Sequence, residues 1–231
     1  LVSVASHTAI RLTLAGRVQG LGVRPAIARW ARQLSLTGWV GNTCQGVEIV
    51  AEGPAGVVQQ FARDLLRQLP RAAVVESHKC ATISPLQSTS FEIRRESVSG
   101  TLKARVPQDL AACEECLCET GSDSGRRSSY AFTSCTACGP RFSIIEAMPY
   151  ERDRTTMRRF ALCSNCQREF DLPEDRRFHA EINACPDCGP RWWCRDKSGR
   201  MVANHGEALH AAAATIRRGE IVALQGLGGY Q

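Results

Sequence analysis

Several features that would define other classes of protein are scarce or missing in this sequence of 231 residues. Aromatic residues make up only 6% of the chain, and no apolar run approaches the ~18 residues that a membrane-spanning helix needs. The sequence therefore predicts no membrane partner. It also has no apolar signal segment, although the start at Leu1 in place of methionine suggests a missing or processed beginning. We expect a cytoplasmic protein.

Cysteine, in contrast, is abundant and regularly spaced. Two quartets read C-x2-C, then 18 residues, then C-x2-C, and the second quartet follows the first at an offset of 50 residues. The same offset relates Glu119 to Glu169 and the Gly-Pro-Arg triplet at 139–141 to that at 189–191. Such a period indicates one small unit used twice, and the spacing is typical of a four-cysteine zinc site. The predicted ligands of two structural zinc ions are Cys113, Cys116, Cys135 and Cys138 in the first module and Cys163, Cys166, Cys185 and Cys188 in the second.

The make-up of the quartets favours a structural metal over a catalytic one, because four cysteine ligands leave no open coordination position. Gly139 and Gly189 follow the second pairs, where a residue at positive φ lets backbone N–H groups point toward sulfur. The polar segments between the pairs predict that the metal supplies most of the folding energy. Disulfides in a secreted protein are the alternative. The other cysteines are expected to be ordinary, partly buried thiols: Cys44, Cys80, Cys118 and Cys194.

The formal net charge of +6 raises the question of nucleic-acid binding. Eight thiolates and two zinc ions would reduce it to about +2. Arginines gather at residues 152–159 and 176–177, but Glu151, Asp153 and residues 174–175 place acids between them. We therefore expect a mixed, solvated surface and no nucleic-acid partner. The alternative left open is a zinc-ribbon nucleic-acid-binding protein whose first domain is inactive.

The order of apolar patterns predicts an α+β fold. Residues 7–95 read strand, helix, strand, strand, helix, strand, which implies a ferredoxin-like βαββαβ sandwich with helices on one sheet. The expected strands are near 7–14, 37–43, 47–51, 73–83 and 90–94, and the expected helices cover 24–36 and 57–69.

The rest of the chain divides into smaller parts. Residues 96–108 read as a linker, and the two cysteine modules occupy 109–150 and 151–194. Residues 207–218 predict an Ala-rich helix and 221–224 a short buried strand, followed by a glycine turn at 226–229. A helix, one strand and a turn do not make a domain, so residues 205–231 look like a third unit that the sequence cuts short.

A glycine-punctuated loop joins the first strand to the first helix. Residues 16–25 read G-R-V-Q-G-L-G-V-R-P. Such a turn directs successive N–H groups at one point, and the helix N-terminus adds its positive end there. Arg24 adds a cation whose planar fork matches phosphate oxygens. Since a glycine loop with one arginine is often only a turn, and Asn42 alone is a typical hairpin residue, a structural interpretation stays open here.

Together with G-W-V-G-N-T-C-Q-G-V-E-I at 38–49, this loop resembles the acylphosphatase signature. The resemblance implies a phosphate-binding cradle and a catalytic pair, Arg24 and Asn42, in which Asn42 orients the attacking water. Val23 stands where that family often has an aromatic residue, which should alter the packing under the loop. The implied phosphate-binding residues are Gln19, Gly20, Leu21, Gly22, Val23 and Arg24.

The resemblance extends over nearly the whole chain. An acylphosphatase-like domain followed by two such cysteine modules is similar to the HypF-type carbamoyltransferases of nickel–iron hydrogenase maturation. Four stretches carry this resemblance and occur in the same order as in that family: P-Q-D-L-A-A-C-E-E-C at 107–116, C-G-P-R-F-S-I-I-E-A-M-P-Y-E-R at 138–152, R-R-F-H-A at 176–180 and G-E-I-V-A-L-Q-G-L-G-G-Y at 219–230. Residues from about 205 would then begin a YrdC-like nucleotide-binding domain. A plain acylphosphatase with a zinc appendage is the other reading.

This resemblance implies substrates and partners that spacing alone does not. Carbamoyl phosphate would be hydrolysed at the first domain, and the missing downstream domains would use ATP and Mg²⁺ to make carbamoyl-adenylate. The carbamoyl group would pass to a cysteine of HypE and become a cyanide ligand of the hydrogenase iron. His179 is expected to form hydrogen bonds or an interface, and residues 192–193, two tryptophans, to pack beside the second module.

Overall fold

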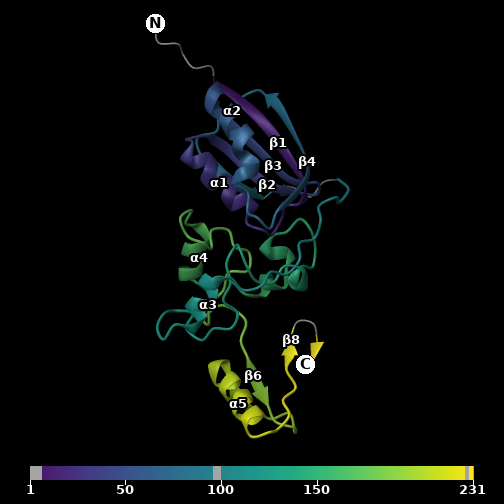
Figure 1. The fold of residues 1–231 in the computed structure, drawn as a ribbon, viewed down its shortest axis with the longest axis vertical. Coiled ribbons are helices and arrows are strands. Elements are labelled where there is room, and N and C mark those ends of the chain that lie inside the picture. The colour runs from purple at the N-terminus through teal and green to yellow at the C-terminus, as the bar shows by residue number, and fades with distance from the viewer. Residues whose placement is uncertain (1–6, 96–99, 227–228, 231) are drawn as a thin grey trace.

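The computed structural model describes residues 7–95, 100–226 and 229–230 of the chain. Residues 7–95 form one five-stranded sheet with two helices against it (Figure 1). Its elements are β1 (His7–Arg17), α1 (Val23–Gln33), β2 (Thr37–Thr43), β3 (Gly46–Pro54), α2 (Ala55–Asp64), β4 (Val74–Ile83) and β5 (Phe91–Arg95).

The strand order is β4-β1-β3-β2-β5, antiparallel except for the parallel pair β2–β5. The first four strands give the predicted ferredoxin-like arrangement, and β5 extends it at one edge. The helix expected over 57–69 is shorter, because a 3-10 turn at Leu65–Gln68 follows α2.

The core of this sandwich follows from strand alternation and helix periodicity. Ile10, Leu12 and Leu14 on β1 are buried and pack in one cluster with Ile27 of α1 and Phe61 of α2. The β1 residues are those predicted to share a face.

One side chain from the cysteine modules joins this cluster. Phe178 is buried in it, and the guanidinium carbons of Arg29 and Arg32 lie 5.6 and 5.3 Å from its ring centre. These distances allow cation–π attraction. Helix α1 is therefore covered by the sheet on one side and by the second module on another.

The middle of the chain holds the two cysteine modules, next to the sandwich in Figure 1. Each begins with a short helix, α3 (Glu114–Gly121) or α4 (Ser164–Asp171). The segments between the cysteine pairs are polar, but the two modules together have an apolar core. They share a buried cluster to which both contribute, formed by Tyr130, Ile144, Met157, Ile182 and Ala184. Neither module has enough apolar side chains alone, so the core forms only when the two combine.

The last described residues form β6 (Trp193–Arg195), β7 (Met201–Asn204), α5 (His205–Arg217), β8 (Gln225–Gly226) and β9 (Gly229–Tyr230). Helix α5 confirms the predicted Ala-rich helix.

The prediction of a buried strand at 221–224 is wrong: these residues are not in a strand, and Ile221 is 97% exposed. No described strand lies beside them to bury them. Residues 227 and 228 of the predicted glycine turn lie outside the described residues. No helix in the described chain is long and apolar enough to span a membrane.

Two glycines test how tightly the sandwich is built. Gly46 has φ of 144°, and a Cβ there would overlap the carbonyl of Leu14, whereas a Cβ on Gly56 in α2 would meet nothing within 4 Å. We expect Gly46→Ala to lower the free energy of unfolding by about 2–4 kcal/mol. Gly56→Ala should raise it by about 0.5–1 kcal/mol. Urea unfolding of the two variants checks this, and equal effects would contradict the described β2–β3 turn.

Candidate functional site

The structure brings each cysteine quartet together. In both quartets the four sulfurs all lie within 4.8 Å of one another. Individual Sγ–Sγ distances are 3.8 Å for Cys113–Cys135 and 3.7 Å for Cys185–Cys188. A tetrahedral site with metal–sulfur bonds of about 2.3 Å has edges of about 3.8 Å, so the spacing fits one metal ion in each cluster. All twelve cysteines are free, which makes the disulfide alternative wrong.

The glycines after the second cysteine pairs differ from each other. Gly139 has φ of 92°, as expected, but Gly189 does not have a positive φ. The reason for glycine at 189 is space, because a Cβ there would lie 2.6 Å from Cβ of Ala184 and would also overlap the hydroxyl of Tyr130. The first cysteine of each quartet directly precedes α3 or α4.

Arginines cross between the two modules in a reciprocal way. Arg126 donates from Nη1 to Sγ of Cys166, 3.1 Å away, and pairs with Glu169. The equivalent Arg176 donates to Sγ of Cys116, 3.0 Å away, and pairs with the equivalent Glu119. Each module thus supplies the cation beside the other module's sulfur cluster.

The second arginine of each pair lies deeper. Arg127, 1% exposed, binds Glu169 and the carbonyl of Ala184, while Arg177 binds Glu119 and the carbonyl of Ser134. The solvated surface expected for the arginines at 176–177 is therefore wrong for Arg177, and Arg127 has a similar environment. They are buried and paired, which leaves them unavailable to a phosphate backbone. Sequence alone could not show this, because each partner comes from the opposite module.

The glycine-rich loop lies between β1 and α1. Gly20 and Gly22 have φ of 70° and 77°. The N–H groups of residues 18–22 donate to no described protein group, and the loop lines one small cavity together with Arg24 and Asn42. The structure therefore brings both predicted catalytic residues to the predicted loop. The sandwich places them there because β1, α1 and β2 meet at this end of the sheet.

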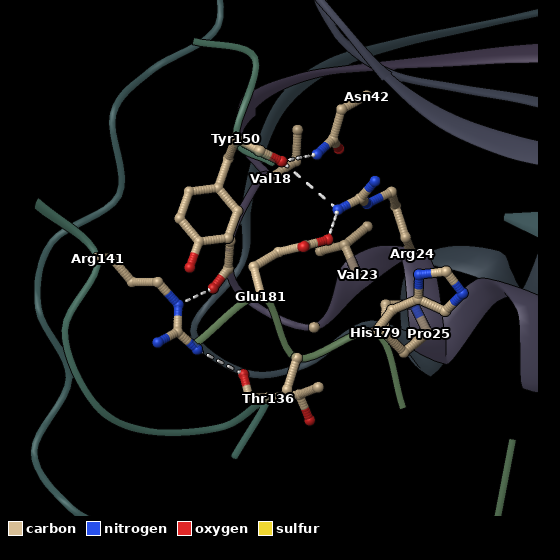
Figure 2. Close-up of a pocket in the computed structure, with 13 residues that line it drawn as sticks. Val18, Val23, Arg24, Pro25, Asn42, Thr136, Arg141, Tyr150, His179 and Glu181 are labelled. Carbon is tan, nitrogen blue, oxygen red and sulfur yellow. Dashed lines mark hydrogen bonds and ion pairs between the residues drawn. The ribbon is translucent and has the colours of Figure 1, made fainter. Parts of the chain in front are cut away.

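Arg24 is 5% exposed and faces two carboxylates of the cysteine modules. Its Nη1 lies 2.5 Å from Oε1 of Glu151, and its Nη2 lies 2.8 Å from Oε1 of Glu181 (Figure 2 shows Arg24 and Glu181). Burial alone would lower the pKa of Arg24, but the two carboxylates outweigh it and raise that pKa. Burial in turn raises the pKa of Glu181 to about 7, against the effect of Arg24.

Asn42 also binds the modules. Its Nδ2 donates to the carbonyl of Tyr150 at 2.7 Å and lies 3.4 Å from Oε1 of Glu151. Its Oδ1 is buried and has no protein partner in the described structure. This acceptor faces the cavity region in Figure 2. One side of the amide is thus fixed, and the other side has an acceptor without a described protein partner.

Gln19 and Arg141 connect the loop to the first module. Gln19 accepts a hydrogen bond from the N–H of Tyr150 at 2.8 Å and donates to the carbonyls of Thr43 and Gly46. The buried side chain of Arg141 donates to the carbonyl of Gly20 and to carbonyls of the cysteine turn at residues 135–140. Gln19 therefore links the loop to the β2–β3 turn and to Tyr150, in addition to its predicted place in the phosphate-binding loop. Arg141 therefore links the loop to the first cysteine cluster.

His179 lines the same cavity and contacts rings of Phe170 and Phe178. Burial, together with Arg24 and other arginines nearby, lowers the pKa of His179 to about 3, so it is neutral near pH 7. It belongs to neither cysteine cluster. Trp192 stacks on Phe132 of the first module and not on the second module as expected, while Trp193 is mostly exposed.

Comparison with known proteins agrees with this geometry. Residues 10–93 match the acylphosphatase family, and residues 112–145 and 162–194 match the HypF finger. The acylphosphatase of Gloeobacter violaceus is 42% identical over 91 residues, which cover 38% of this chain and 97% of that protein. The sandwich is thus an acylphosphatase domain, and the cysteine modules are finger modules.

The whole chain has longer relatives. Carbamoyltransferase HypF of Synechocystis is 46% identical over 222 residues, 96% of this chain and 29% of that protein. A crystal structure of full-length HypF in the phosphate- and nucleotide-bound form superposes with a TM-score of 0.89 at 33% identity, covering all of this chain and 30% of the other. The chain belongs to the HypF carbamoyltransferases, as their N-terminal portion. It spans less than a third of the length of these relatives.

Sequence reasoning missed three side chains that reach the loop. Glu151 and Glu181 lie 127 and 157 residues from Arg24 along the chain, so no local pattern connects them to it. Arg141 had a signal, since it ends the repeated Gly-Pro-Arg triplet. Its equivalent Arg191 caps the carbonyls of its own cysteine turn in the same way but is exposed.

Replacing Glu169 tests the crossed arginines. Glu169→Gln would remove the closer carboxylate of the buried Arg127 and leave it only Glu119 at 3.3 Å, and we expect the free energy of unfolding to fall by about 3 kcal/mol. Glu114→Gln, on the exposed start of α3, should change it by less than about 0.5 kcal/mol. Urea unfolding of metal-loaded protein is the measurement. Similar values for both variants would show that the cross-module pairs contribute nothing.

Proposed function

We propose that the acylphosphatase domain hydrolyses carbamoyl phosphate to carbamate and phosphate. The observation that supports this most is the meeting of the 18–22 loop, Arg24 and Asn42 in one buried cavity. The relatives are carbamoyltransferases, and the structure of one of them contains bound phosphate; together these support a carbamoyl phosphate substrate.

Each residue has a distinct task in this reaction. The loop amides and Arg24 hold the phosphoryl oxygens and stabilise the charge that they gain in the transition state. Asn42 directs a water molecule at phosphorus through its free Oδ1. The new bond joins water oxygen to phosphorus, and the bond from phosphorus to the carbamate oxygen breaks. Because carbamate is a good leaving group, positioning is enough and no general base is required.

We further propose that zinc occupies both cysteine clusters as a structural metal. A set of four thiolates suits zinc, and it leaves no position for substrate. The metal would fix the cysteine turns, and Arg141 carries that order to Gly20 in the phosphate loop. The cluster would thus support the site without taking part in the chemistry.

The later steps belong to the remainder of a full-length protein. There we propose that ATP with Mg²⁺ activates carbamate as carbamoyl-adenylate and that a cysteine of HypE accepts the carbamoyl group, for the cyanide ligand of the hydrogenase. The nucleotide bound to the full-length relative supports an ATP step. Free, clustered cysteines suit a reducing compartment, which supports the cytoplasm as its location.

Hydrolysis is tested by phosphate release from carbamoyl phosphate. We expect Arg24→Ala to lower kcat/KM by about 10²–10³, because it removes a transition-state charge partner. Asn42→Ala should lower kcat by about 10² with a smaller change in KM, because water positioning is lost. Arg11→Ala, an exposed change on β1, is the control. Release that survives both site variants would reject this domain as the hydrolase.

Metal content tests the finger modules. We expect two zinc ions per chain, and one after either Cys138→Ser or Cys188→Ser. Cys138→Ser should also reduce hydrolysis more than Cys188→Ser, because only the first cluster touches Arg141. Elemental analysis and phosphate release measure the two effects. Cys118→Ser, at an exposed cysteine beside the first cluster, should keep both ions. A full metal load in Cys138→Ser would contradict the assignment.

A further inference from the structure

One oxygen of Glu151 occupies a distinctive position. Its Oε1 accepts from Arg24 Nη1 at 2.5 Å and lies 3.4 Å from Asn42 Nδ2. A single anionic oxygen therefore contacts both side chains assigned to the phosphoryl group and its attacking water. Both of the hydrogen bonds described for this carboxylate end on that same oxygen. This is the place that a phosphate oxygen would take in the cradle.

Glu181 also pairs with the guanidinium of Arg24, but it has more hydrogen bonds than Glu151. Its Oε1 accepts from Arg24 Nη2 at 2.8 Å, and its Oε2 accepts from the backbone N–H of Arg152 at 3.1 Å. The Nη1 of Arg152 also donates to the carbonyl of Glu181 at 2.5 Å. Both carboxylate oxygens and the backbone are thus anchored. Its side chain is 2% exposed, against 10% for Glu151.

The cavity beside Arg24 is too small for the substrate as it stands. Its free volume is about 20 Å³, which admits about one water molecule. A phosphate group can enter only if a side chain leaves. Glu151 is the weaker-held group, and it sits on the atoms that phosphate must contact.

We propose that the two carboxylates have opposite roles. Glu151 occupies the phosphate position in the empty site and is displaced when phosphate binds, whereas Glu181 stays bound to Arg24 and positions its guanidinium. The assignment of phosphate to this cradle rests on the function proposed above. The second finger thereby supplies a residue of the acylphosphatase site, and the segment between the fingers supplies its competitor.

Charge supports this division of roles. A phosphate dianion beside two ionised carboxylates and one guanidinium would be strongly unfavourable in a buried site. Departure of Glu151 removes one negative charge and frees Nη1 of Arg24. The pKa of Glu181, raised by burial to about 7, allows it to be partly protonated near neutral pH, which reduces the remaining repulsion.

Binding of inorganic phosphate to the metal-loaded chain, measured by titration calorimetry, tests the proposal without requiring turnover. We expect Glu151→Gln to tighten phosphate binding about tenfold, since a competitor that occupies ~90% of molecules raises the apparent Kd tenfold. We expect Glu181→Gln to weaken it about tenfold, with Glu181→Asp recovering part of the loss. Asp153→Asn, at an exposed arginine pair in the same segment, should stay within about twofold.

A double variant separates a site effect from a folding effect. Because Glu151 acts through Arg24, Glu151→Gln combined with Arg24→Ala should bind phosphate no better than Arg24→Ala alone. If both glutamine variants bind phosphate more tightly, both acids only compete with phosphate. If both variants bind phosphate more weakly, Glu151 also positions Arg24 and is not displaced. Either result overturns the proposal. Unchanged affinities, or no phosphate binding in any variant, would also overturn it.

These outcomes are distinct from failure of the proposed function. If the two variants shift phosphate affinity in opposite directions but carbamoyl phosphate is not hydrolysed, the carboxylate roles stand and the substrate assignment fails. If hydrolysis depends on Arg24 but the glutamate variants do not differ, the substrate assignment stands and the carboxylate roles fail.

Discussion

The gathering of eight cysteine sulfurs into two clusters is the constraint on which the rest of this structure depends. The segments between the cysteines are short of apolar side chains, and their helices α3 and α4 have only eight residues each. Helices of that length are not stable alone in water. Fixing the clusters fixes the turn that Arg141 caps. It also restrains His179 and Glu181, which line the cavity at the glycine-rich loop and lie shortly before Cys185. The geometry of the loop thus follows from sulfur placement far from it in sequence.

The two modules pack as one unit because arginines of each module form ion pairs with a glutamate of the other. Glu119 receives Arg176 and Arg177 from the second module, and Glu169 receives Arg126 and Arg127 from the first. Arg126 and Arg176 each donate to a cysteine sulfur of the opposite module. The shared apolar cluster of Tyr130, Ile144, Met157, Ile182 and Ala184 lies at the same junction. Separating the modules would leave both charges and apolar surface unsatisfied.

Much of this architecture was predictable because its signals are local. Cysteine spacing predicted both sulfur clusters, strand alternation predicted the sandwich, and the glycine loop with Arg24 and Asn42 predicted which residues share a cavity. What was missed depends on contacts between distant segments. Glu151 and Glu181 have no local feature that sets them apart from surface acids, and the arginines at 126–127 and 176–177 look solvated until the modules combine. The strand expected at 221–224 failed for a related reason, since a strand needs a neighbour that apolar pattern alone does not supply.

The position of the two glutamates has a consequence for how the chain matures on the ribosome. All five strands of the sandwich have been synthesised once Arg95 is made, but Glu151 and Glu181 are synthesised later. At ordinary elongation rates the interval up to Glu181 lasts roughly 4–17 s. A nascent acylphosphatase domain therefore has time to fold while Arg24 still lacks both of these carboxylates. Arg24 is covered only when the second finger arrives, so the newborn domain and the finished protein present different surfaces around the glycine-rich loop.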